Sequence, residues 1–522
     1  AKVEAFTLKN SPNISVSIDD REERHDSRDR PQRSDGRGAA GSKRARENNA
    51  DDNDARTPQE KINDQVTPLW RQPYLDQLAQ KLVRFKNGLG SLKKELLKLI
   101  NSRDVLEEKK AELEYLRLLG KVSICELQDV VPSPVIDGYR NKCEFTVGFD
   151  LDGKPTVGFL LGLFKEGITC VLPPDECLNV SPVAKKVAAT FQAFINESKL
   201  LPYDRIKQVG FWRLVQVRNQ TTGDVMVVVQ VNPVGSDAED RKEAIKLLTE
   251  RFQEAGYLKT LLVQESSEAH NGFIDNIPCT PLIGEGIVYE ELLGLKFRIS
   301  PTSFFQINTE ATKGLYSCVR DWATNSTAVA AGDPENTESV NEATETTAVT
   351  ATTAPSKNVV LLDLCCGTGT IGLILASKVK KVIGVEMVAE AIKDAEFNAR
   401  LQKQENVSYI CKKVEDAMHE VFKYHVNPGD EVVAVLDPPR AGVHDNVIRA
   451  IRGCKGINKI VFVSCDFENA LKNFIGLCRP SSKKFEGLPF RPVRAVPYDL
   501  FPHSSHCEFV VELNRVSLPK RK

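Results

Sequence analysis

Beyond residue 357 the sequence alternates short runs of apolar and β-branched residues with helical patterns, and this alternation restricts the fold more than any other feature. Seven strands are expected, at 359–365, 382–386, 407–411, 432–437, 459–465, 493–499 and 507–513. Because helical patterns separate the first five, they predict a parallel, doubly wound sheet that is covered on both faces. No long helix separates the last two strands, which predicts an antiparallel hairpin at one edge of the sheet.

A glycine-rich loop follows the first of these strands. The stretch LDLCCGTGTIGL places Gly367, Gly369 and Gly372 in G-x-G-x-x-G spacing between a strand and a helix. Glycines let the backbone approach a cofactor, and the N-terminus of the helix offers N–H groups. Glu386 ends the next strand, and a carboxylate there can accept hydrogen bonds from both ribose hydroxyls. This pattern fits a nicotinamide cofactor and S-adenosylmethionine equally well.

The end of the fourth strand favours one of these cofactors. In VLDPPRAG, residues 435–442, Asp437 precedes two prolines at the carboxyl edge of the sheet. Prolines donate no backbone hydrogen bonds and stiffen the loop, which holds the neighbouring groups for a planar base. A methyltransferase acting on a nucleobase needs such a loop, whereas a nicotinamide enzyme has no evident use for it. An ordinary loop beginning with X-Pro-Pro is the alternative interpretation.

Cys465 lies where the fifth strand opens into a helix, in the stretch KIVFVSCDFENA at 459–470. A buried core thiol is the simpler interpretation, because free cysteine is among the most buried residue types. The chemical interpretation starts from uracil, whose C5 is a poor nucleophile. A thiolate that adds to C6 makes C5 nucleophilic, and a base must then remove the C5 proton before the cysteine leaves.

Glu508, in FPHSSHCEFVVEL at 501–513, is the carboxylate that can serve as this base. An exposed charge on an edge strand explains the residue equally well. His503, His506 and Cys507 stand nearby, but no second cluster completes a metal site, so we expect no metal.

Composition restricts the partners and the compartment. The chain has 522 residues, more than one domain requires, and a net charge of −1. Any nucleic-acid binding must therefore come from a local basic surface. Thirteen cysteines without a CxxC pair favour reduced thiols, in the cytosol or the nucleus, over a disulfide framework. No run reaches the roughly 18 apolar residues that a membrane span needs.

The rest of the chain divides into segments of different character. Residues 10–66 have few apolar residues and are predicted to be disordered. Apolar residues such as Leu75 recur at three-to-four spacing in 73–118 and predict two helices, divided at Gly88 and Gly90. Residues 121–300 are β-rich, with expected hairpins around Asp152-Gly153 and Thr222-Gly223. Short basic runs, SKRAR at 42–46 and PKRK at 519–522, are candidates for nuclear import or RNA contact.

Several separated motifs together resemble the tRNA (uracil-5-)-methyltransferase family, the TrmA-like enzymes that make 5-methyluridine in RNA. The resemblance covers roughly residues 120–515. The motifs are GYRNKCEF at 138–145, ISPTSFFQINTEA at 299–311, LDLCCGTGTIGL, LDPPRAG, VSC and FPHSSHCE, and their order makes the resemblance specific.

The resemblance implies an α/β fold, in which a Rossmann-like sheet binds S-adenosylmethionine and a smaller, β-rich α/β domain lies in the centre of the chain. It implies that Cys465 is the nucleophile and Glu508 the base. The positions that contact the cofactor are Gln306, Cys365, Gly367, Gly369, Thr370, Glu386 and Asp437. Phe145 matches an aromatic residue that stacks on the flipped uracil, and Arg140 is a candidate for contacting RNA.

The expected organisation follows from the resemblance and the composition. We expect residues 1–72 to be disordered or a linker that follows a missing N-terminal domain, and residues 73–118 to be helical. The central RNA-contacting domain is expected at 119–300 and the methyltransferase domain at 301–515, with a disordered insertion at 324–357. Residues 516–522 are expected to form a basic tail. The family's usual substrate is uridine 54 in the T-loop of tRNA, with mRNA or other RNA as further candidates. We expect a cytosolic monomer, with the nucleus as a second location, and neither membrane association nor an iron–sulfur cluster.

One departure from the family pattern concerns the nucleophile. The family commonly follows Ser-Cys with Asn-Pro, whereas this chain has Asp466-Phe467, and an acidic neighbour is expected to raise the pKa of the thiol. Three alternative functions remain. A cytosine-C5 RNA methyltransferase generally carries its cysteine after proline, whereas Cys465 follows Ser464. An RNA-binding or folding factor with dispensable catalysis, and a nicotinamide oxidoreductase, are the other two.

Overall fold

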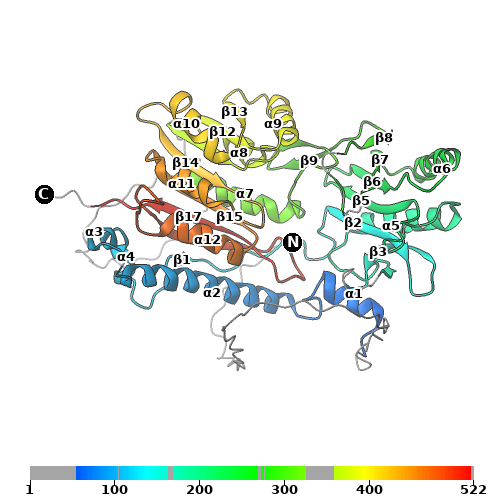
Figure 1. Ribbon diagram of the computed structural model, residues 1–522, viewed down its shortest axis with the longest axis horizontal. Coiled ribbons are helices and arrows are strands. Elements are labelled where there is room, and N and C mark those ends of the chain that lie inside the picture. Colours follow the sequence, from blue (N-terminus) through cyan, green and yellow to red (C-terminus); the bar gives the residue numbers. More distant parts are fainter. Residues whose placement is uncertain are drawn as a thin grey trace, which may run out of the picture. The chain divides into compact units, whose positions relative to one another are not determined.

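The computed structural model describes residues 55–103, 105–162, 169–268, 272–274, 277–324 and 358–518 (Figure 1). The basic runs at 42–46 and 519–522, and the insertion from residue 325 to residue 357, lie outside the described residues. From Arg56 onward, the described residues form one compact unit.

An eight-stranded sheet contains the strands expected beyond residue 357. Its order is β1-β16-β17-β15-β14-β11-β12-β13. The bounds are Glu126–Leu127 (β1), Val359–Leu364 (β11), Lys381–Glu386 (β12), Val407–Cys411 (β13), Glu431–Leu436 (β14), Ile457–Ser464 (β15), Phe490–Tyr498 (β16) and Glu508–Arg515 (β17). Strands β11 to β15 run parallel, and β17 runs antiparallel to both β15 and β16. The predicted parallel sheet with an antiparallel hairpin is confirmed, and β1 adds an unforeseen parallel edge strand.

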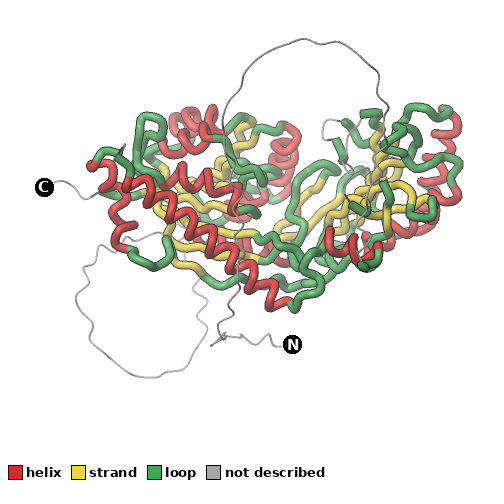
Figure 2. The backbone as a smooth tube through the Cα atoms, turned by 60° about the horizontal axis from the view of Figure 1, so that its bottom comes forward, coloured by secondary structure: helices red, strands yellow, loops and turns green. Residues whose placement is uncertain are grey.

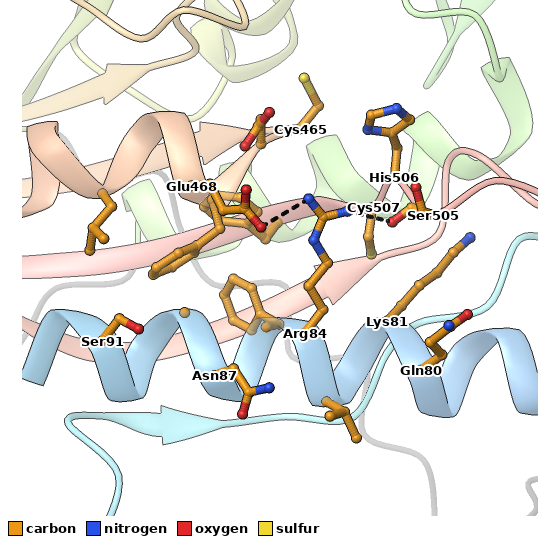
Figure 3. A pocket seen from close by; sticks show the side chains of 17 residues that line it. Gln80, Lys81, Arg84, Asn87, Ser91, Cys465, Glu468, Ser505, His506 and Cys507 are labelled. Carbon is orange, nitrogen blue, oxygen red and sulfur yellow. Dashed lines mark hydrogen bonds and ion pairs between the residues drawn. The ribbon is translucent and has the colours of Figure 1, made fainter. Parts of the chain in front are cut away.

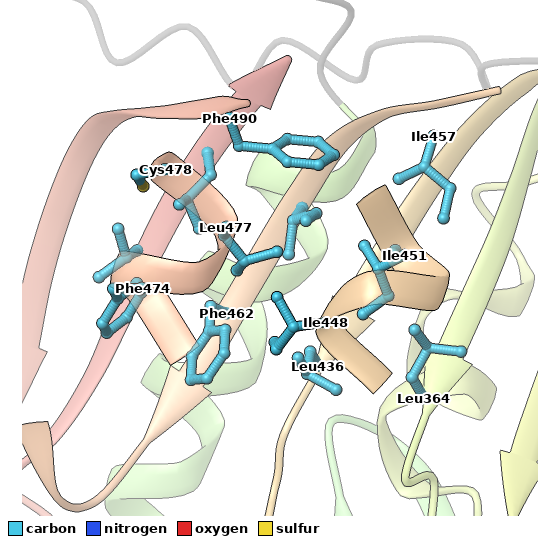
Figure 4. Close-up of a cluster of buried hydrophobic side chains, with 14 of the residues drawn as sticks. Leu364, Leu436, Ile448, Ile451, Ile457, Phe462, Phe474, Leu477, Cys478 and Phe490 are labelled. Carbon is cyan, nitrogen blue, oxygen red and sulfur yellow. The ribbon is translucent and has the colours of Figure 1, made fainter. Parts of the chain in front are cut away.

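Helices cover both faces of this sheet because its strands are apolar on both sides. On one face, side chains of α2, α10, α11 and α12 pack with Leu436 and Phe462. Figure 4 shows the part of this cluster that includes Ile448 of α11 and Phe474 of α12. On the other face, α7, α8 and α9 pack with Leu361 and Val461. The bounds are Tyr74–Asn101 (α2), Thr309–Thr324 (α7), Thr370–Ala376 (α8), Ala389–Leu401 (α9), Val414–Tyr424 (α10), Asp445–Gly453 (α11) and Phe467–Cys478 (α12).

A seven-stranded sheet, ordered β4-β3-β2-β5-β6-β7-β8, forms a second core with helices α5 and α6. The bounds are Lys142–Phe149 (β2), Pro155–Leu160 (β3), Val171–Leu172 (β4), Pro182–Glu197 (α5), Trp212–Asn219 (β5), Val225–Val231 (β6), Ala238–Ala255 (α6), Thr260–Glu265 (β7) and Thr280–Ile283 (β8). A separate antiparallel pair joins Val288–Leu292 (β9) to Leu295–Ile299 (β10). The two predicted hairpins, β2–β3 and β5–β6, are confirmed.

The first described segment corrects two predictions. Part of the stretch predicted to be disordered forms helix α1, Pro58–Val66, because Thr57 and Glu60 build a capping box at its start. Helix α2 is one helix rather than two, because Gly88 provides a close contact instead of a break. A Cβ atom at Gly88 would lie 2.4 Å from the Phe467 ring. Helices α3 (Glu107–Lys110) and α4 (Glu114–Leu118) follow, with a 3-10 turn at Ala111–Leu113 between them.

The first turns of α2 bury polar side chains. Leu75, part of the predicted apolar face, is 71% exposed, whereas Gln77 and Lys81 are buried. The face that packs on the protein is therefore polar at its start and becomes apolar only from Phe85 onward.

These polar side chains hold the segment that leads into β17. The Lys81 ammonium donates to Asp499 Oδ1 at 2.6 Å and to the Phe501 carbonyl at 3.0 Å. The His503 N–H donates to Gln77 Oε1 at 2.8 Å. Helix α2 and the start of β17 are thereby fixed to each other, although they lie at opposite ends of the sequence.

Loss of the Lys81–Asp499 ion pair should destabilise the protein. Both side chains are at most 1% exposed, so Lys81→Met leaves a buried carboxylate without its cation. Such a loss typically costs about 3–5 kcal/mol. Lys98→Met is the matched control on the same helix, because its 2.6 Å pair with Glu95 is exposed and contributes little. We expect thermal unfolding at a clearly lower temperature for Lys81→Met alone, and equal midpoints for both variants would contradict this role.

Candidate active site

A thiol and a carboxyl group meet where β15 ends and β17 begins. In this antiparallel pair Ser464 lies opposite Phe509. Cys465 follows Ser464 and Glu508 precedes Phe509, so the register sets the two side chains opposite each other on one face. Cys465 also lies at the carboxyl edge of the parallel strands, where open α/β sheets bind their ligands. The structure thus brings together the two residues to which the sequence assigned the chemistry.

Three further candidates end neighbouring strands at the same edge. Strand β11 lies between β12 and β14, with Leu364 opposite a residue of each. Cys365, Glu386 and Asp437 are the next residues of these three strands. The parallel register therefore places them side by side at the carboxyl edge.

The loop after β11 adopts the conformation that its glycines allow. Gly367 and Gly369 have φ values of 52° and 76°, in the left-handed region. A Cβ atom at Gly369 would lie 2.4 Å from the Tyr409 hydroxyl, whereas a Cβ atom at Gly367 would enter open space. Cys365 also has a positive φ, 63°, which a residue other than glycine adopts at a cost of about 1–3 kcal/mol.

Backbone donors hold the Glu386 carboxylate beside this loop. One oxygen accepts from the N–H groups of Met387 (2.8 Å) and Val388 (3.0 Å), and the other accepts from Gly367 (3.2 Å). The side chains of Met387 and Val388 are 65% and 51% exposed. The fixed Glu386 carboxylate can accept hydrogen bonds from ribose hydroxyls. The exposed apolar side chains of Met387 and Val388 and the open space at Gly367 leave room for a flat base joined to that ribose. These residues therefore fit the adenosine part of S-adenosylmethionine, and Thr370 begins the helix behind the loop.

Gln306 is positioned by a residue of the GYRNKCEF motif. The Asn141 amide donates to the Gln306 carbonyl and to the Thr309 hydroxyl, both at 2.9 Å. The Gln306 side chain is 6% exposed and forms a hydrogen bond with Tyr316 of α7. Burial raises the pKa of Tyr316 well above its ordinary value, and the negative charge of Asp437 adds to the rise. Sequence patterns do not single out Tyr316, because a tyrosine on an amphipathic helix resembles any other core residue.

The Cys465 thiol is held in its protonated form. Burial raises its pKa to about 11, and the negative charges of Glu508 and Asp437 act in the same direction. Arg440 opposes this rise, because its guanidinium is close enough to attract the thiolate and to hydrogen-bond it. Arg440 belongs to the LDPPRAG motif but was given no role from sequence. Its position in the loop after Asp437 is the sequence feature that could have predicted a role in the site.

Glu508 and Asp437 are buried carboxyl groups, and the charge of Asp437 acts on Glu508. Burial raises the pKa of Glu508 well above its ordinary value, Asp437 raises it further, and Arg440 lowers it. Burial raises the pKa of Asp437 to about 7. The negative charge of Asp437 thus disfavours ionisation of Glu508. Glu508 is 3% exposed, so the alternative that it is an exposed edge-strand charge is wrong.

Cys465 lines a cavity of about 450 Å³ between α2 and the segments around Phe467 and His506 (Figure 3). Arg84 reaches across this cavity from α2. Its guanidinium donates to a carboxylate oxygen of Glu468 at 3.2 Å and to the Ser505 carbonyl at 3.3 Å.

The departure Asp466-Phe467 has a structural reason. Asp466 caps α12 by accepting from the Asn469 N–H at 3.1 Å. The Phe467 ring packs edge-on against Phe85 of α2, with 5.1 Å between the ring centroids. The carboxyl groups that raise the pKa of the neighbouring thiol are those of Glu508 and Asp437, and the expectation that Asp466 has this effect is not supported.

The structure contradicts the assignment of Phe145 to base stacking. Its ring is 0% exposed and packs against Phe159 in the core of the second sheet, with 5.3 Å between the centroids. A ring without exposed surface cannot stack on a base. Phe304, two residues before Gln306, is 67% exposed instead. Arg140 is partly exposed and donates to the Lys142 carbonyl at 2.7 Å, and its RNA contact stays a prediction.

The thirteen cysteines are all free thiols. Within the described ranges, no group of three or more His, Cys, Asp or Glu side chains is arranged to hold a metal ion. His503 instead contacts Asp137 at 2.7 Å. A Pro-Cys dipeptide, the context typical of the alternative cytosine enzymes, ends at Cys279, which is next to β8 of the second sheet.

The raised pKa of Cys465 predicts a steep pH dependence of its alkylation. Because the thiolate is the reactive form and the pKa is about 11, the rate with iodoacetamide should rise about tenfold per pH unit between pH 7 and 9. Arg440→Met removes the cation that stabilises the thiolate and should slow the reaction at every pH. Mass spectrometry of the Cys465 peptide measures both rates. A rate independent of pH in this range would show that the thiolate is already formed.

Known proteins resemble this chain over most of its length. Residues 355–438 match a family model described as a methyltransferase domain. The human tRNA (uracil-5-)-methyltransferase homolog A is 36% identical over 470 residues, which cover 88% of this chain and 69% of that protein. The human homolog B is 34% identical, over 88% of this chain and 84% of that protein.

One solved structure shares the fold. It is the tRNA (uracil-54, C5)-methyltransferase of Pyrococcus abyssi in complex with S-adenosyl-L-homocysteine, with a TM-score of 0.52 and 21% sequence identity. The match covers 78% of this chain and 82% of that one. The expected α/β fold with a Rossmann-like methyltransferase sheet is thereby confirmed.

Proposed function

The chain belongs to the tRNA (uracil-5-)-methyltransferase family, and from this membership we propose that it methylates C5 of uracil in tRNA with S-adenosylmethionine. Within tRNA, uridine 54 of the T-loop is the proposed target. The observation that carries the proposal is the pairing of Cys465 with Glu508 at one end of β15 and β17. Other RNA substrates, a monomeric state and a cytosolic or nuclear location stay predictions. No helix in the described ranges has the length and apolarity to cross a membrane.

Cys465 is the proposed nucleophile. In its thiolate form it forms a bond to C6 of uracil, and the electron pair of the C5–C6 double bond moves to C5 and the adjoining carbonyl group, which makes C5 nucleophilic. Arg440 favours this step because it stabilises the thiolate against the burial that raises its pKa. Bound S-adenosylmethionine supplies the electrophilic methyl group that C5 takes up.

Glu508 is the proposed base. In its carboxylate form it accepts the proton from C5, after which the C5–C6 double bond forms again and the C6–S bond breaks. The burial that raises the pKa of Glu508 makes its carboxylate a stronger base than an exposed glutamate. Arg440 lowers the same pKa and so keeps the carboxylate form accessible.

The remaining residues are proposed to bind and orient the cofactor and the uracil base. Glu386 is proposed to hold the ribose of the cofactor, with Cys365, Gly367, Gly369 and Thr370 around it and Asp437 and Gln306 toward its reactive end. A base inside an RNA loop must leave its stack to reach Cys465. Phe304 has the exposure that stacking on an extruded uracil needs, and it takes the role that the sequence assigned to Phe145.

Replacing the nucleophile should separate catalysis from cofactor binding. Cys465→Ala should abolish the formation of 5-methyluridine in tRNA, because the proposed bond to C6 forms at this thiol. The affinity for S-adenosylmethionine, measured by calorimetry, should stay within a few-fold, because Glu386 and the glycine loop hold the cofactor. Cys454→Ala, which also removes a partly buried thiol, is the control that keeps activity. Substantial turnover by Cys465→Ala would rule out the covalent mechanism.

Replacing the base should trap the covalent adduct. Glu508→Gln resembles the buried, protonated acid and should fold normally, and it still permits thiolate addition and methylation of C5. The proton then stays on C5, and the C6–S bond persists, because general-base catalysis typically contributes about 10²–10⁴-fold. A denaturing gel with tRNA and S-adenosylmethionine should show a slow protein–RNA band.

The same gel contains its controls. The Cys465→Ala/Glu508→Gln double variant should lose the band, because the bond to RNA forms at the thiol. If Glu508→Gln instead released methylated tRNA at the wild-type rate, the base would lie elsewhere in the site.

A further inference from the structure

The solvent side of α2 carries a continuous polar and basic strip that the proposed mechanism does not use. We define the basic strip as Gln80, Arg84, Asn87, Ser91, Lys94 and Lys98, all of which are exposed. Their spacing of three or four residues places them along one side of the helix. At 1.5 Å per residue the strip is about 27 Å long, and it contains no carboxylate.

The basic strip runs out of the candidate active site. Its first part, from Gln80 to Ser91, lines the 450 Å³ cavity that also contains Cys465. Its second part lines another hollow of about 580 Å³, between Gly90 and Asn101. Figure 2 shows α2 as the long helix across the front of the view. A chain bound along this side of α2 therefore passes through the cavity that Cys465 lines.

The adjoining side of α2 is anchored to the catalytic segment. The buried contacts of Gln77 and Lys81 with residues 499–503, and of Phe85 with Phe467 and Phe509, fix the helix beside Cys465. A rigid support of this kind sets the distance between a bound backbone and the reacting base. The basic strip is thus placed to fix the register of a substrate as well as to attract it.

Charge identifies the occupant. The chain has a net charge of −1, so attraction of a polyanion must come from a local surface. The carboxylates paired with the basic strip are Glu468, with Arg84 at 3.2 Å, and Glu95, with Lys98 at 2.6 Å, and both pairs are exposed. Exposed pairs contribute little, so phosphate groups can replace these carboxylates as partners. The small side chains of Asn87, Gly90 and Ser91 allow a backbone to approach closely.

We propose that the basic strip binds the phosphate backbone of the RNA stem next to the target uridine. This inference rests on the proposed function, because it assigns the RNA that enters the same site. A nucleic-acid strand carries one phosphate about every 3.4 Å of a B-form axis, so a strip of about 27 Å meets several successive phosphates. Arg84 contacts the phosphate nearest the flipped base, and Lys94 and Lys98 contact those farther along the stem.

The test compares two pairs of lysines that differ only in location. Lys94→Gln/Lys98→Gln removes two charges from the basic strip, and Lys242→Gln/Lys246→Gln removes two exposed charges with the same spacing from α6. Affinity for tRNA is measured by fluorescence anisotropy from 50 to 300 mM salt. The slope of log affinity against log salt should fall by about 1.8 for the strip variant, at about 0.9 per phosphate contact on a duplex, and should not change for the α6 variant.

A second pair of variants, both at Ser91, distinguishes an effect of charge from an effect on the fold. Ser91→Glu places a carboxylate in the middle of the basic strip, and Ser91→Gln has the same shape without the charge. Only Ser91→Glu should weaken tRNA binding and raise KM for tRNA. The value of kcat and the affinity for S-adenosylmethionine should not change in either variant.

The outcomes separate this inference from the proposed function. If the wild type forms 5-methyluridine but the strip and α6 variants have equal salt slopes, the basic strip does not bind RNA and the proposed function stands. If the slopes differ as expected but no 5-methyluridine forms, the strip binds RNA and the proposed reaction is wrong. Equal tRNA affinity with altered self-association of the strip variant would assign this surface to a second copy of the chain and overturn the inference.

Discussion

The antiparallel placement of β17 beside β15 is the constraint on which the proposed chemistry depends. In a wholly parallel sheet, the carboxyl ends of the strands share one edge, and residues that begin strands lie at the opposite edge. Because β17 runs the other way, its first residue, Glu508, arrives at the edge where β15 ends before Cys465. The β16–β17 hairpin therefore adds the proposed base to an edge that already carries Cys365, Glu386 and Asp437.

That placement depends in turn on the segment before β17, which distant parts of the chain hold. Lys81 and Gln77 bind it from α2, and the Tyr139 hydroxyl donates to the Pro502 carbonyl at 3.1 Å. His503 within it has a φ of 65°, a left-handed conformation that costs a residue other than glycine about 1–3 kcal/mol. The surrounding contacts must supply this energy. Helix α2 is therefore part of the active-site architecture, even though it contributes no residue to the proposed bond-making steps.

How much the sequence could predict follows from the distance over which each pattern acts. Strands and the glycine loop can be predicted because each is a pattern of neighbouring residues. Because the carboxyl ends of parallel strands meet at one edge of a sheet, the sequence also predicts that Cys465 and Asp437 lie near each other. The buried face of α2 could not be predicted, because Lys81 is polar and its partner lies 418 residues away. The prediction that Phe145 stacks on a base was wrong, because a sequence motif identifies a residue but does not show whether its side chain lies on the buried or the exposed face of its strand. Arg440 acts through a charge distribution that only the folded chain shows.

The same burial has opposite effects on the reactivity of the two groups that we propose to react. Desolvation raises the pKa of Cys465 to about 11, which reduces the thiolate, and it raises the pKa of Glu508, which strengthens the base once it is ionised. Asp437 adds negative charge and raises both pKa values further. Arg440 lowers both, because a cation stabilises thiolate and carboxylate alike. Without this arginine both pKa values would be higher still, and the thiolate and the carboxylate would be rarer at neutral pH. The arginine of the LDPPRAG loop is therefore the group that favours the ionised forms of both the buried thiol and the buried glutamate.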